Sequence, residues 1–184
     1  MYPASLFADL LPSLGITRFR VVPVSLIVFS SAFRDLCASN QCGKYGTNWT
    51  CPPGVGSFDT LVARARRFSF GLVMQTVWPI GDSFDIEGMF AAGEKHNELI
   101  RHAVETLLPK LEGRETLTLS AGACAICATC TFSSGEPCRL PGQAISSLEA
   151  YGIDVAQLIA DSELSYTNGP NTVSYVGLLL FKGN

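Results

Sequence analysis

Apolar residues recur along the chain with two different spacings, and these predict alternating strands and helices. Runs rich in β-branched and other apolar residues predict strands at 21–30, 69–78, 116–120 and 172–181. Apolar residues at helical spacing predict helices at 4–14, 57–68, 83–111, 141–151 and 154–161. The order predicts a single α/β or α+β domain over residues 1–184, with about four strands in one sheet and helices flanking it.

Proline and capping residues set several of the expected boundaries. Pro12 is expected to end the first helix early, and Pro23 places the start of the first strand at an edge or a bulge. Ser57 and Asp154 are expected N-caps, because short polar side chains accept hydrogen bonds from free N–H groups at helix starts.

The longest helical segment, residues 83–111, carries an apolar stripe that is expected to face the core. His96 lies at the edge of this stripe, where a histidine is most often a hydrogen-bonded core residue, and His102 lies nearly opposite and is expected to be exposed. His96 is also the best-placed non-cysteine metal ligand. The stripe consists of Ile86, Met89, Phe90, Ile100, Val104, Leu107, Leu108 and Leu111.

Composition narrows the classes of function. The chain has 184 residues, of which 47% are hydrophobic, enough for a sizeable core. Only 16% are charged, against about 25% in an ordinary domain, which suits either a surface that docks on a partner or a compact fold with a large core. The net charge of −3 argues against nucleic-acid binding.

The amino-terminal sequence predicts no export or membrane insertion. It lacks an early basic region, and Asp9 interrupts its apolar run, unlike a secretory signal. The apolar stretch 21–29 contains Pro23 and is far shorter than a membrane span. We therefore expect a reducing, cytoplasmic setting.

The seven cysteines form two tight groups, and an odd number cannot all pair within one chain. This pattern favours metal ligation over a disulfide scaffold.

The second group has the more specific spacing. Cys124, Cys127 and Cys130 follow a C-x2-C-x2-C pattern, and Cys138 comes eight positions later. Thiolates suit iron–sulfur clusters and zinc alike, but zinc sites more often use two separated cysteine pairs. The spacing therefore favours a [4Fe–4S] cluster, with zinc, a disulfide or free thiols as alternatives. Arg139 could offset the negative charge of such a cluster, or be an ordinary surface arginine.

The first group consists of Cys37, Cys42 and Cys51, on a glycine- and proline-rich stretch expected to be a loop from residue 37 to 53. Three thiols predict a second metal site with one open position, so the chain would hold one cluster or two. The fourth ligand could be His96, a carboxylate or a second protein. Alternatively, some of these thiols cap the site formed by the other group.

Both cysteine groups lie in stretches that resemble signatures of a known family. The run CGKYGTNWTCPP at 42–53, the segment from Cys124 to Pro141 and the run SLEAYGIDV at 147–155 resemble the predicted metal-binding proteins called domain of unknown function 2284. The resemblance runs from about Arg34 to the C-terminus, so residues 1–33 form a helix and a strand without a signature. It implies metal ligation by both cysteine groups and supplies no reaction.

Three functions remain open. The chain could be a [4Fe–4S] protein that transfers electrons to a partner enzyme. It could be an iron–sulfur enzyme whose open site on Cys37, Cys42 and Cys51 performs reductive or sulfur-handling chemistry. It could also be a structural zinc-binding interaction module. The sequence contains no phosphate-binding glycine loop and no hydrolase motif.

Overall fold

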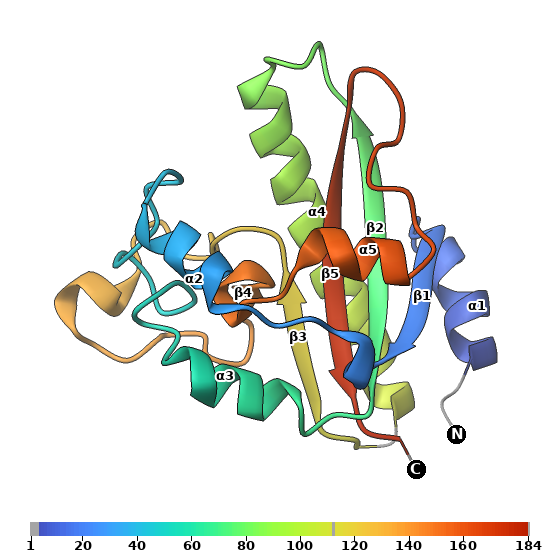
Figure 1. Ribbon diagram of the computed structural model, residues 1–184, viewed down its shortest axis with the longest axis horizontal. Helices are drawn as coiled ribbons and strands as arrows, with labels where there is room; N and C mark the ends of the chain where they lie inside the picture. The colour runs from blue at the N-terminus through green and yellow to red at the C-terminus, as the bar shows by residue number, and fades with distance from the viewer. Residues whose placement is uncertain (1–3, 112, 184) are drawn as a thin grey trace.

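The computed structural model describes residues 4–111 and 113–183, and its centre is one open sheet with the strand order β1-β2-β5-β3-β4 (Figure 1). Neighbouring strands are antiparallel except β3 and β4, which are parallel. The strands are β1 (Arg18–Pro23), β2 (Phe70–Pro79), β3 (Thr116–Ser120), β4 (Ser146–Ser147) and β5 (Thr172–Phe181). The fold is therefore α+β, with five strands among the described residues where about four were predicted.

Helices cover both faces of this sheet (Figure 1). Helices α1 and α4 pack on one face, and α3 and α5 pack on the other. The α-helices are α1 (Ala4–Ser13), α2 (Ser31–Ala38), α3 (Phe58–Ala65), α4 (Ile86–Leu107) and α5 (Val155–Asp161). Short 3₁₀ helices lie at η1 (Val24–Leu26), η2 (Leu108–Leu111), η3 (Thr131–Ser134) and η4 (Glu149–Tyr151).

The core is divided by the sheet into two apolar clusters, because successive side chains of a strand point to opposite faces. On β2, Leu72 and Met74 join the cluster under α1 and α4, whereas Val73 joins the cluster under α3 and α5. Both central strands are thus buried on two faces, which explains why their sequences are nearly continuous apolar runs.

The predicted capping residues are confirmed. The side chain of Ser57 accepts a hydrogen bond from the Thr60 amide, and Asp154 accepts one from the Gln157 amide. Asp85 caps α4 by accepting from the Gly88 amide at 2.8 Å. Pro12 lies inside α1, one residue before its end at Ser13, so the helix continues past the proline but ends one residue before the predicted position 14.

The strand predicted at 21–30 is wrong in its position. Strand β1 covers Arg18–Pro23, and η1 follows it directly. Pro23 therefore ends the strand and does not begin it. The reason is that β1 is an edge strand, whose exposed positions tolerate Arg18 and Arg20, so its sequence does not look apolar.

The helix predicted at 141–151 is also wrong. Residues 141–143 form a turn, Ser146 and Ser147 form β4, and η4 follows. Ser147 pairs with Ser120 of β3, so tertiary pairing overrides the local helical spacing. In addition, residues 31–38 form the unpredicted helix α2, which includes Cys37, so the expected loop begins only after it.

The apolar stripe predicted on the long helix is buried only over its C-terminal part. Ile100 and Leu107 are buried, whereas Ile86 and Phe90 are 62% and 71% exposed. The first turns of α4 meet the outer part of β5, where the Tyr175 hydroxyl donates to the Met89 carbonyl at 2.6 Å. The sheet ends near this point, so it does not cover the remaining apolar side chains.

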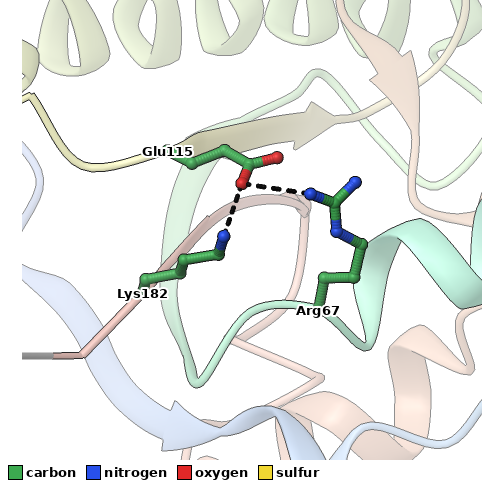
Figure 2. Close-up of polar contacts among 3 residues, drawn as sticks. All are labelled: Arg67, Glu115 and Lys182. Atoms are coloured by element: carbon green, nitrogen blue, oxygen red, sulfur yellow. Dashed lines mark ion pairs between the residues drawn. The ribbon is translucent and has the colours of Figure 1, made fainter.

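A surface ion-pair network joins three elements at the opposite end of the sheet (Figure 2). Glu115 lies 2.7 Å from the Lys182 amino group and 3.5 Å from the Arg67 guanidinium. The hydrogen bond from Lys182 is the main cause of a lowered pKa for this carboxyl group. Exposed ion pairs contribute little to stability. The network therefore only connects the ends of β3, β5 and α3 at the surface.

Within the described residues, no helix combines the length and the apolar character that a membrane crossing requires.

Candidate metal centre

Both cysteine loops project together beyond the side of the sheet that β3 and β4 form (Figure 1). The first loop leaves α2 and returns to α3, and the second leaves β3 and returns to β4. Parallel pairing of Leu119 with Ser146 and Ser120 with Ser147 closes the base of the second loop. The short strand β4 thus holds both ends of the segment that carries Cys124, Cys127, Cys130 and Cys138 in one place.

The structure brings the four cysteines of the second group to the wall of one cavity. This cavity has a volume of about 30 Å³, and each of the four thiols is half-buried. The side chain of Arg139 also lines it, and its guanidinium donates to the Thr129 carbonyl at 3.3 Å. Its other wall comes from the first loop, through Asn48, Trp49 and Thr50.

The donor set of this cavity fits a thiolate-bound metal centre, since four soft sulfur donors and one cationic side chain surround it. In the described part of the chain, no three His, Cys, Asp or Glu side chains already lie close enough to hold a metal ion. At about 30 Å³ the cavity is narrow, so a four-iron cluster would require the loop to move outward.

Thr50 connects the two loops at the cavity itself. Its side-chain oxygen accepts a hydrogen bond from the Cys124 amide at 3.1 Å and donates to the Asn48 side-chain oxygen at 2.7 Å. Both Asn48 and Thr50 are 4% exposed. Because buried polar groups need partners, this network fixes where the second loop begins its turn around the cavity.

Aromatic packing makes a second connection between the loops. The Trp49 ring meets the Phe132 ring edge-on at 4.9 Å, and its indole N–H donates to the Glu136 carbonyl at 3.0 Å. Gly54 permits this approach, because a Cβ atom there would lie 2.6 Å from the Phe132 ring. Trp49 therefore packs the first loop against the second.

The three thiols of the first group are electrostatic neighbours. Burial is the main cause that raises the pKa of Cys37, and Glu149, Cys51 and Cys42 add to it. Burial likewise raises the pKa of the Cys51 thiol, although hydrogen bonding from Asn48 opposes the shift. Both thiols therefore favour the protonated form unless a cation is present to stabilise the thiolate.

Arg34 fixes the helix that carries Cys37. Its guanidinium donates to the Ala150 carbonyl and to the Gly56 carbonyl, each at 2.7 Å. Arg34 also lowers the pKa of Cys37, against the larger effect of burial. The carboxylate of Glu149, next to Ala150, is the acidic group that adds to the raised pKa of Cys37.

His96 lies in the core, facing the sheet. It is fully buried, its Nδ1 lies 2.8 Å from the Thr76 hydroxyl, and its ring lies 5.7 Å from that of Tyr175. These are the contacts of a hydrogen-bonded core histidine. His102 is exposed, as predicted.

The burial of His96 predicts a loss of stability in acid. Burial lowers its pKa from 6.5 to about 4, so between these values the unfolded chain binds a proton that the folded chain does not. The free energy of unfolding should therefore fall as pH is lowered from about 6.5 towards 4, with a loss of about 2–3 kcal/mol at pH 4.5. Urea unfolding of the parent and His96→Asn at pH 7 and 4.5 measures this contribution, which the variant should lack.

His102→Gln is the control for this measurement, because it removes an exposed imidazole. An equal acid-induced loss in the parent and in His96→Asn would contradict the assignment to His96.

Asn48, Thr50, Arg34 and Glu149 were not predicted as site residues. Asn48 and Thr50 lie within the cysteine-rich run at 42–53, so their closeness in sequence to Cys51 was the signal that could have identified them as site residues. Arg34 and Glu149 act across the fold on a helix that the sequence pattern did not reveal.

Comparison with known proteins gives one match. The family model described as "Predicted metal-binding protein (DUF2284)" matches residues 20–181. The match starts at residue 20, earlier than the predicted start near Arg34, so it includes the end of β1. No curated protein and no solved structure matches the chain.

Proposed function

The chain belongs to the DUF2284 family of predicted metal-binding proteins, and from this premise we propose that it is a [4Fe–4S] protein that transfers electrons to a partner enzyme. The observation that carries the proposal is the single cavity lined by Cys124, Cys127, Cys130 and Cys138. A cluster bound there would supply reversible one-electron transfer.

The surrounding residues suit this role. Arg139 places a cation beside a centre that four thiolates would make negative. Thr50 holds the Cys124 amide, and such outer contacts keep first ligands oriented. Because the loops project from the edge of the sheet, a partner protein can approach the cavity without displacing a helix of the core (Figure 1).

A second candidate is an iron–sulfur enzyme with an open metal position on the first group. The observation that favours it is that Glu149, Cys51 and Cys42 all act electrostatically on the Cys37 thiol and, after burial, raise its pKa. A three-thiol centre there would lie next to the four-thiol cavity, because Cys51 directly follows Thr50. A structural zinc site is the third alternative.

Metal analysis of anaerobically purified protein tests the proposal. We expect about four iron and four acid-labile sulfide per chain for one cluster, and a one-electron EPR signal after dithionite reduction. About twice that iron would support a second cluster on the first group. A colourless protein with tightly bound zinc and no iron would overturn the electron-transfer proposal.

Removal of the Thr50 hydroxyl should weaken the metal centre. Thr50→Val keeps the shape of the side chain but leaves the part-buried Cys124 amide without its acceptor. We expect metal affinity to fall by about 10–100-fold, as for other outer-shell contacts. Competition with a chelator measures the change.

Thr106→Val is the matched control, because the Thr106 hydroxyl donates within α4 to the His102 carbonyl. If both variants release metal at the same chelator concentration, Thr50 does not support the centre.

A further inference from the structure

A second, larger cavity lies between α4 and the beginning of the second cysteine loop. Its volume is about 270 Å³, and its wall includes Cys124, one of the four thiols of the metal-site cavity. The helix contributes Glu94, Asn97, Glu98 and Arg101, while the loop contributes mainly alanines. A cavity of this size beside a candidate metal ligand can hold a small organic molecule.

The charged side chains of the cavity are of both signs. Glu94, Glu98 and Arg101 lie about one helical turn apart, so Glu94 and Arg101 are separated by about 10 Å along the axis. Among the described residues, the ion pairs are those of Glu115, and none of these three takes part in one. Glu94 and Glu98 are exposed and Arg101 is half-buried, so a ligand in the cavity can reach all three side chains.

Asn97 connects helix α4 to the start of the second cysteine loop. Its amide nitrogen donates to the Ala121 carbonyl at 2.9 Å, and its amide oxygen accepts from the Ser120 hydroxyl at 2.6 Å. Both partners lie at the end of β3, where the loop begins. Both ends of the Asn97 amide are therefore already hydrogen-bonded within the protein. Recognition of a ligand is left to the charged residues on either side of Asn97.

We propose that this cavity binds a small zwitterion of the amino-acid class, with its ammonium group at Glu94 and Glu98 and its carboxylate at Arg101. A ligand with one anionic group alone would be repelled by the two carboxylates, and a simple cation would leave Arg101 without a partner. A molecule with both groups satisfies all three side chains. The proposal adds a substrate or effector site to the proposed electron-transfer function.

Binding of defined probes to the full chain tests this site. The probes are L-alanine, β-alanine, γ-aminobutyrate and 6-aminohexanoate, which differ in the separation of their charges, with butyrate and butylamine as single-charge analogues. Titration calorimetry should detect at least one zwitterion, and both analogues should bind at least about tenfold more weakly, because each loses one charged contact. Failure of all four zwitterions to bind at 10 mM, or equal binding of an analogue, would overturn the proposal.

Variants locate the binding within the cavity. Arg101→Gln and Glu98→Gln should each weaken binding of the best probe by about tenfold or more. Glu105→Gln, an exposed position of α4 outside the cavity, should leave it unchanged. Equal affinity in the parent and in Arg101→Gln would place the binding elsewhere and overturn the proposal.

Iron and sulfide analysis of the same preparations separates this inference from the proposed function. A probe that binds to protein without iron would leave the zwitterion site standing and refute the cluster. A protein with a full cluster that binds no probe would support the cluster and refute the zwitterion site.

Discussion

Cys127→Ser is expected to abolish metal binding at the four-thiol cavity. Cys127 is one of the thiols that line this cavity, and a serine hydroxyl is a hard, weakly acidic ligand that replaces thiolate poorly on iron or zinc. We expect at least a tenfold loss of bound metal per chain, a larger effect than loss of an outer contact. Iron, sulfide and zinc analysis of the anaerobically purified variant measures it.

Cys42→Ser is the control for this prediction. Cys42 belongs to the first group and is exposed, and the four-thiol cavity does not include it among its lining residues. The spectrum of a cluster in that cavity should therefore survive in Cys42→Ser. Full metal content in Cys127→Ser, or equal losses in both variants, would contradict an independent four-thiol centre.

Gly152→Ala is expected to give the largest loss of fold stability. Gly152 has a φ of +72°, and a Cβ atom there would lie 2.4 Å from the Phe58 ring and 2.8 Å from the Ser30 carbonyl. Backbone strain and the clash together should lower the free energy of unfolding by about 3 kcal/mol or more. Urea unfolding of the two proteins measures the difference.

The same substitution should also disturb the first cysteine group. The Ser30 amide donates to the Gly152 carbonyl at 2.7 Å, and Ser30 caps α2, which carries Cys37. Gly15→Ala is the matched control, since Gly15 has a φ of +88° with no atom near the added methyl group. Gly15→Ala should lower the free energy of unfolding by only about 1 kcal/mol. An equal loss in both variants would show that the clash at Gly152 is unimportant.

Short-range chemistry accounts for what sequence reasoning predicted well. The long apolar runs of β2 and β5 need two buried faces, and only the centre of a sheet supplies them. The N-caps at Ser57 and Asp154 depend on hydrogen bonds within one helical turn, so the side chain and its partner are close in sequence.

Elements that depend on distant partners were missed or misplaced. Helix α2 is tied to the rest of the fold by Arg34, whose acceptors are the Gly56 and Ala150 carbonyls. Strand β4 exists because β3 pairs with it, although its own sequence favoured a helix. The N-terminal turns of α4 have a core-like stripe, but the sheet ends before it can cover Phe90.

The two cysteine groups and their spacing can be read directly from the sequence, because they are local properties of the chain. Only the tertiary structure decided that the loops share a wall, through a contact between Thr50 and Cys124 that spans 74 positions of the chain. The fold also places Glu94, Glu98 and Arg101 of α4 along one wall of a cavity that includes Cys124. The physical reason is that such contacts form only after the sheet has brought distant segments together, and no local spacing encodes them.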